Sequence, residues 1–127
     1  MTTSTPRSLT QHRMVWGFRI LLALAFGAAG ASKLAGVPQM VQLFDAVGFG
    51  QGFRYLTGAV EIMGALLVLV PATGFLGGLL LAATMVGGVA THLLLIGGNP
   101  FPAMVLGLLS AFVAWRLRPA SPSSVGR

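Results

Sequence analysis

Four long apolar stretches, separated by short breaks rich in glycine, proline or polar residues, dominate the pattern of this chain. They run over about residues 14–35, 55–70, 75–96 and 101–117. Each approaches the roughly 20 residues that an α-helix needs to cross the hydrocarbon of a bilayer. No segment alternates apolar and polar residues for long enough to indicate a membrane barrel. The pattern therefore predicts an all-α, integral membrane four-helix transmembrane bundle.

The breaks between these stretches carry clear turn signals. Residues 71–74 (PATG) predict a tight turn, and residues 97–100 (GGNP) end the third stretch, with Asn99 as the expected N-cap of the fourth. Residues 38–47 (PQMVQLFDAV) place apolar side chains on one side of a helix. They predict a short interfacial helix lying across one end of the bundle.

The polar tails define the limits of a single domain. Residues 1–13 and 118–127 are rich in Ser, Thr, Pro and Arg, and we expect both to be disordered. Residues 14–117 then form the four-span transmembrane domain.

Composition supports a membrane protein and excludes several other classes. The 127 residues are 55% hydrophobic and 8% charged, whereas soluble domains carry about 25% charged residues. No cysteine is present, which excludes disulfides and thiolate ligands, and two histidines with two acids are too few for a metal site with several protein ligands. The basic residues flank the apolar stretches, so nucleic acid is not an expected partner and the lipid bilayer is.

The basic residues also predict the orientation in the membrane. Four spans place both termini on one side, and positively charged residues favour the cytoplasm. We therefore expect a multi-pass protein of the bacterial cytoplasmic (inner) membrane with both termini cytoplasmic. The terminal side would carry six arginines and the opposite side two basic residues: Arg7, Arg13, Arg19, Arg116, Arg118 and Arg127, against Lys33 and Arg54.

A polar constellation is predicted near the outer ends of the spans. Glu61 is one of only two acids in the chain, yet it lies within an apolar stretch, where a carboxylate is costly unless it is paired or faces a polar cavity. Lys33 and His92 fall at a similar depth on two other spans. Asp45 and Asn99, in the connections, border the same region. These five residues form the candidate polar or ligand site.

Three roles remain open for this constellation. It is a structural network that fixes helix register, or a ligand pocket in which a histidine and a carboxylate hydrogen-bond a quinone-type head group, or a conduit of a small carrier. Arg19 and Arg54 are interpreted as contacts to lipid head groups or to a partner subunit. Small residues at helical spacing indicate close helix packing, and they leave homo-oligomerisation open.

The ordered set of polar residues resembles a known family. The first span reads FRILLALAFGAAGASKLAG, the second LTGAVEIMGALLVLVP and the third LLLAATMVGGVATHLL, and the fourth ends in WRLRP. Together they resemble the DoxX-like family of small four-helix bacterial membrane proteins over about residues 14–119. The resemblance places Arg19, Lys33, Glu61 and His92 at the family's polar positions.

The resemblance implies an association with membrane oxidoreductases. Some members look like the small membrane subunit of a thiosulfate–quinone oxidoreductase. It implies an accessory or quinone-facing subunit with redox-complex partners, and the alternative is a non-catalytic scaffold or lipid-binding protein. Whether the chain is itself an enzyme stays open.

Overall fold

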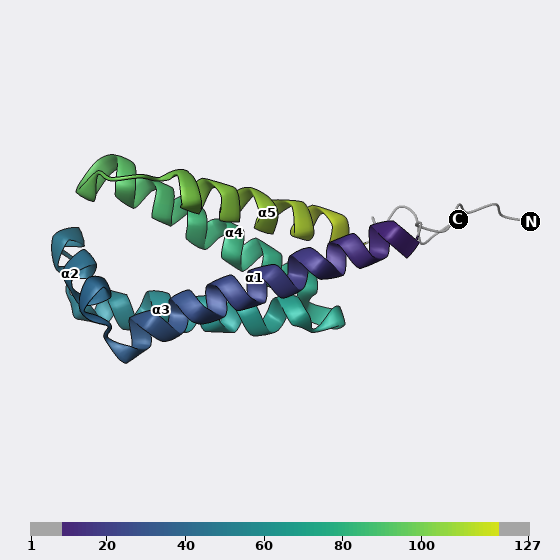
Figure 1. Cartoon of the computed structure of the whole chain (residues 1–127), viewed down its shortest axis with the longest axis horizontal. Helices are drawn as coiled ribbons and strands as arrows, with labels where there is room; N and C mark the ends of the chain where they lie inside the picture. Colours follow the sequence, from purple (N-terminus) through teal and green to yellow (C-terminus); the bar gives the residue numbers. More distant parts are fainter. Residues whose placement is uncertain (1–8, 120–127) are drawn as a thin grey trace, which may run out of the picture.

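The computed structural model describes residues 9–119, and within this range every regular element is helical. Figure 1 shows the arrangement. The elements are α1 (Leu9–Ala35), α2 (Pro38–Val47), α3 (Gln51–Leu69), a 3₁₀ turn η1 (Pro71–Thr73), α4 (Gly74–Thr91), a π-helical turn η2 (His92–Ile96) and α5 (Phe101–Leu117).

The long helices form two pairs, because α1 packs along α3 and α4 packs along α5. The pairs converge at the end where α1 begins and α5 ends, and they diverge toward the opposite end (Figure 1). Helix α2 lies across the diverging end, close to η2.

Three segments are long and apolar enough to cross a membrane: α1 with 27 residues, α3 with 19, and the continuous helical stretch 71–96 with 26. Helix α5 is also apolar but has 17 residues. At 1.5 Å per residue it reaches about 25 Å, against a hydrocarbon core of about 30 Å. The helical architecture is thus confirmed, while the count of four spans stays a prediction.

The short helices α2 and α5 have the bounds that the proline- and glycine-containing breaks in the sequence predict. Helix α2 covers residues 38–47, begins at a proline and ends at Gly48, whose φ of 89° is a left-handed conformation suited to glycine. Helix α5 covers residues 101–117. Helix α1 already begins at Leu9, so the expected disorder is wrong for residues 9–13, which contain neither glycine nor proline. Residues 1–8 and 120–127 lie outside the described part.

Glycines allow the helices to approach backbone to backbone. A Cβ at Gly77 of α4 would lie 2.5 Å from the backbone nitrogen of Val68 in α3, and one at Gly78 would lie 2.9 Å from that of Ala114 in α5. Such distances exclude a side chain without movement of the helices. The apolar core lies beside these contacts and contains Leu22, Phe26, Ala65, Val68, Leu81 and Val113.

Candidate functional site

An ion pair links α1 to α3 inside the bundle. The Lys33 Nζ lies 2.7 Å from the Glu61 Oε1, and the Glu61 side chain is only 2% exposed, against 15% for Lys33. Among residues 9–119 this is the single polar contact of the carboxylate. A buried carboxylate with one partner retains unused acceptor capacity, since its two oxygens offer about four lone-pair sites.

The local sequence makes room for this ion pair. Gly30 and Gly58 face each other across α1 and α3, and a Cβ on either would come within 3.0 Å of the carbonyl oxygen of the other. A Cβ at Gly58 would also lie 3.0 Å from the Lys33 Cβ. The absence of a side chain at Gly58 therefore lets Lys33 lie against α3, one turn before Glu61.

The ion pair borders a cavity of about 440 Å³ between the two helix pairs. Its lining comes from all five α-helices and η2, and it includes Lys33, Glu61 and His92 together. Helix α2 contributes apolar side chains, among them Phe44 and Val47. The volume is within the range of small-molecule sites, which combine apolar walls with a few convergent polar groups.

His92 begins the π-helical turn η2 and is fixed by a backbone contact. Its Nδ1 lies 2.8 Å from the carbonyl oxygen of Gly97. A carbonyl only accepts hydrogen bonds, so Nδ1 carries the hydrogen, and in the neutral ring Nε2 is left as an acceptor. Single π-helical turns occur frequently at functional sites. The sequence pattern did not predict this turn.

Asp45 and Asn99 bind locally and are not among the residues that line the cavity. The Asp45 Oδ1 accepts a hydrogen bond from the Gln51 side chain at 2.8 Å. The Asn99 Oδ1 accepts one from the backbone N–H of Phe101 at 3.0 Å, but the N-cap of α5 is Pro100 and not Asn99 as expected. Of the five candidate residues, three thus meet at one cavity and two do not.

Arg54 differs from the expectation of a head-group contact. Its side chain is buried, its Nε donates to the Gln51 Oε1 at 2.6 Å, and its Nη1 donates to the carbonyl oxygen of Lys33 at the end of α1. The φ of 71° at Gly36 ends α1 beside this guanidinium. This acceptor is a backbone carbonyl, which has no signature in the sequence.

Arg19 also corrects the expectation of a side chain that reaches lipid head groups. It is 3% exposed, its Nε donates to the carbonyl of Val68 at 2.7 Å, and its Nη2 donates to that of Val70 at 3.1 Å. The guanidinium also stacks 3.8 Å from the centre of the Trp16 ring. It satisfies the carbonyl of Val68, which the end of α3 leaves without a helical partner, and it shares the carbonyl of Val70 with the backbone N–H of Thr73.

The two arginines therefore cap each other's helices. Arg19 of α1 binds the end of α3, and Arg54 of α3 binds the end of α1. The two contacts, Arg19 to Val68 and Arg54 to Lys33, are related by the symmetry of an antiparallel helix pair. The spacing from Arg19 to Arg54 in the sequence equals the spacing from Lys33 to Val68. Each end of the α1–α3 pair is closed by a charge-assisted hydrogen bond.

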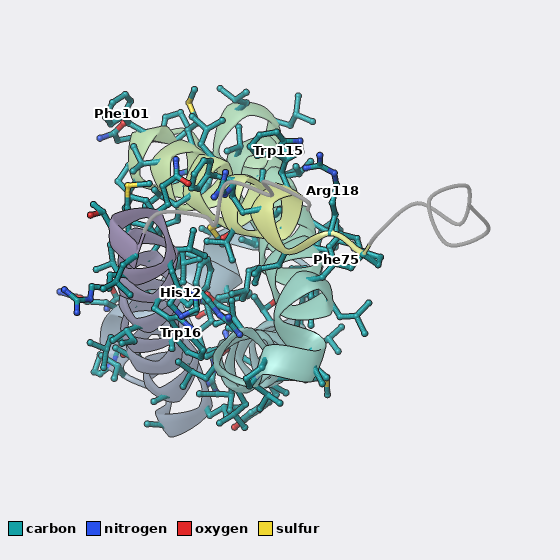
Figure 2. All side chains as sticks on the ribbon, turned by 90° about the vertical axis from the view of Figure 1, so that its right-hand side faces the viewer. His12, Trp16, Phe75, Phe101, Trp115 and Arg118 are labelled. Carbon is teal, nitrogen blue, oxygen red and sulfur yellow. The ribbon has the colours of Figure 1, made fainter. Side chains whose placement is uncertain are left out.

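The end opposite the cavity carries aromatic and basic side chains. Figure 2 looks onto this end and shows Trp16 on α1, and Trp115 with Arg118 where α5 ends. The Arg118 guanidinium lies 4.8 Å from the centre of the exposed Trp115 ring. Such pairs are typical of the membrane–water interface. No group of three or more His, Cys, Asp or Glu within residues 9–119 is arranged to hold a metal ion.

Comparisons with known proteins agree with the resemblance in the sequence. The model of the DoxX-like family matches residues 18–116. A protein of Bacillus subtilis (strain 168), named Putative oxidoreductase CatD, is 29% identical over 73 residues, which are 58% of this chain. The match spans about half of that relative, 54% of its length. No solved structure matches.

Proposed function

The chain belongs to the DoxX-like family of membrane proteins, and from this premise we propose that it is an accessory, quinone-facing subunit of a membrane oxidoreductase complex. The cavity between the helix pairs would hold the quinone head group at Lys33, Glu61 and His92. The relative's name as an oxidoreductase supports the class of reaction. Because the match covers only about half of that relative, the redox reaction of this chain is proposed here and is not taken from the relative.

The observation that carries the proposal is the buried Glu61 carboxylate beside a cavity. A carboxylate at this depth is expensive, and intramembrane ionisable residues mark functional sites by default. Glu61 has one protein partner and further acceptor sites, and the cavity beside it takes a small molecule. A structure in which the carboxylate only joined two helices would not need the cavity.

The residues present fit a quinone head group. The Lys33 ammonium donates hydrogen bonds, as a quinone carbonyl requires, while Glu61 and the His92 Nε2 accept, as a quinol hydroxyl requires. Apolar side chains of α2 and α3 wall the rest of the cavity and suit the ring and its tail. A bound quinone would supply two-electron redox chemistry, and this chain's residues would orient the head group and exchange protons with it.

A partner subunit would supply the electrons. The 127 residues contain no cysteine, so thiol and iron–sulfur chemistry would come from a partner. We place the protein in the bacterial inner membrane with four spans and cytoplasmic termini, on the excess of arginine at the terminal end. The described part of that end includes Arg13, Arg116 and Arg118, and both carboxylates lie away from it.

Mass spectrometry of lipids and proteins that co-purify in mild detergent tests the proposal. We expect a quinone and a redox subunit with the wild type, and loss of the quinone in Glu61→Gln and His92→Gln. Each variant has a matched control in the same chain. Asp45→Asn also removes a carboxylate, and His12→Gln also removes a histidine, but neither residue lines the cavity. Equal quinone content in all five proteins, or none in any, would contradict the proposal.

A structural role is the second candidate, and the ion pair favours it. Lys33 and Glu61 join α1 to α3, and buried polar pairs can specify one arrangement of helices. This role, in a scaffold or lipid-binding protein, predicts that Glu61→Gln lowers the melting temperature in detergent. Unchanged melting together with loss of the quinone would exclude it.

A further inference from the structure

The hydrogen-bonding groups that line the cavity are unequally divided between donors and acceptors. Three threonines line it: Thr57, Thr84 and Thr91. Each donates its hydroxyl hydrogen to the carbonyl four residues earlier in its own helix, at 2.7–2.8 Å. A hydroxyl has one hydrogen and two lone pairs, so these hydroxyls can only accept from a ligand.

The ionisable groups of the lining add further hydrogen-bond acceptors. Glu61 accepts only, and because the His92 Nδ1 donates to Gly97, the neutral ring offers Nε2 as an acceptor. Lys33 is the one side chain in the cavity lining with hydrogens left to donate, since one of its three is directed to Glu61. The cavity lining thus contains five side chains that accept hydrogen bonds and a single one that donates.

From this inventory we infer that the cavity selects a head group that donates hydrogen bonds, namely the dihydroxy ring of a quinol, over the corresponding quinone. A quinol hydroxyl accepts from Lys33 and donates to an acceptor such as Glu61 at the same time. A quinone carbonyl satisfies only Lys33 and offers no hydrogen to the acceptors of the wall, so the accepting sites that Lys33 does not use stay without a partner. Unpaired buried groups are what reject an analogue most strongly.

This inference rests on the proposed function, since it concerns the same cavity, and the two can fail separately. The proposed function needs a quinone-type ligand in either oxidation state. The inference adds the order of affinities and assigns it to acceptors on α3, α4 and η2.

The test compares decylubiquinol with decylubiquinone, titrated without oxygen into the full-length protein in nanodiscs. The third ligand is the quinol with both hydroxyls methylated, which has no hydrogen-bond donor. We expect the quinol to bind about tenfold more tightly than the other two, as one hydrogen bond to a charged acceptor would give.

Variants assign the preference to the acceptors. Glu61→Gln, whose amide can donate, should reduce the ratio of quinol to quinone affinity toward one, while Asp45→Asn keeps it. Thr91→Val removes an acceptor at little risk to folding and should lower quinol affinity alone.

Three outcomes are distinguishable. A quinol preference that Glu61→Gln or Thr91→Val weakens supports the inference. Equal or tighter binding of the quinone, still sensitive to Glu61→Gln, overturns the inference and leaves the proposed function standing. Binding of both ligands that no cavity variant changes, or no binding at all, overturns both.

Discussion

Buried charges in this protein are held by groups that the chain itself supplies. Arg19 and Arg54 bind backbone carbonyls at helix ends, and Glu61 binds Lys33. The sequence allowed the Lys33–Glu61 pair to be predicted, because both side chains fall at one depth on neighbouring spans. The two arginine contacts escaped prediction, because hydropathy does not separate a buried cation from one that reaches the interface.

At the residue scale, we expect Lys33→Met to reduce the free energy of unfolding by about 3 kcal/mol, because it leaves the Glu61 carboxylate buried without a partner. The double variant Lys33→Met, Glu61→Gln should regain most of this loss. Unfolding by titration with SDS in mixed micelles measures both. Losses that simply add would show that the pair is not coupled.

Arg19→Met should also destabilise the fold, by about 2–4 kcal/mol, since it removes two hydrogen bonds to carbonyls at the end of α3. Arg13→Met is the matched control, because Arg13 is exposed on the same helix, and it should change stability by less than about 0.5 kcal/mol. The same SDS titration compares them. Equal losses of stability in the two variants would mean that Arg19 contributes to stability only through its charge and not through its hydrogen bonds.

At the element scale, the helices whose ends carry proline or glycine were predicted best. Helix α2 begins at Pro38 and ends at Gly48, and α5 follows Pro100, so local chemistry marks these ends. The π-helical turn at His92 has no such mark. It continues the helical run of α4 with neither proline nor glycine at the junction between Thr91 and His92.

The glycines of α4 provide a test of helix packing. Gly77→Ala would place a methyl group against the backbone of Val68, so we expect a loss of about 1–3 kcal/mol. Gly87→Ala lies on the same helix with nothing within 4 Å, and it should be neutral or stabilise by up to about 1 kcal/mol. Thermal unfolding in detergent compares the two. Similar melting temperatures would contradict the close approach of α3 and α4.

At the scale of the whole molecule, composition and spacing predicted an all-helical membrane protein, and the helices confirm it. They did not predict that the two helix pairs diverge at one end, since that follows from which side chains fill the space between them. The convergence of Lys33, Glu61 and His92 on one cavity could be predicted, whereas the local bonds of Asp45 and Asn99 could not.

The topology can be tested directly because the chain contains no cysteine. Single cysteines at the exposed positions Gln42, His12 and Pro119 are treated with a maleimide that does not cross membranes. We expect Gln42→Cys to react in intact cells, and His12→Cys and Pro119→Cys only after permeabilisation. Reaction of Pro119→Cys together with Gln42→Cys would show that α5 does not cross the bilayer.

The paired arginine caps have a mechanical consequence. If α1 slid along α3 by a single turn, about 5.4 Å, Arg19 would lose Val68 and Arg54 would lose Lys33 in the same movement. Piston-like displacement of these helices is thereby blocked from both ends. We therefore expect helices α1 and α3 to move as one unit, so that a tilt of α4 and α5 about the end where the pairs converge would change the width of the cavity.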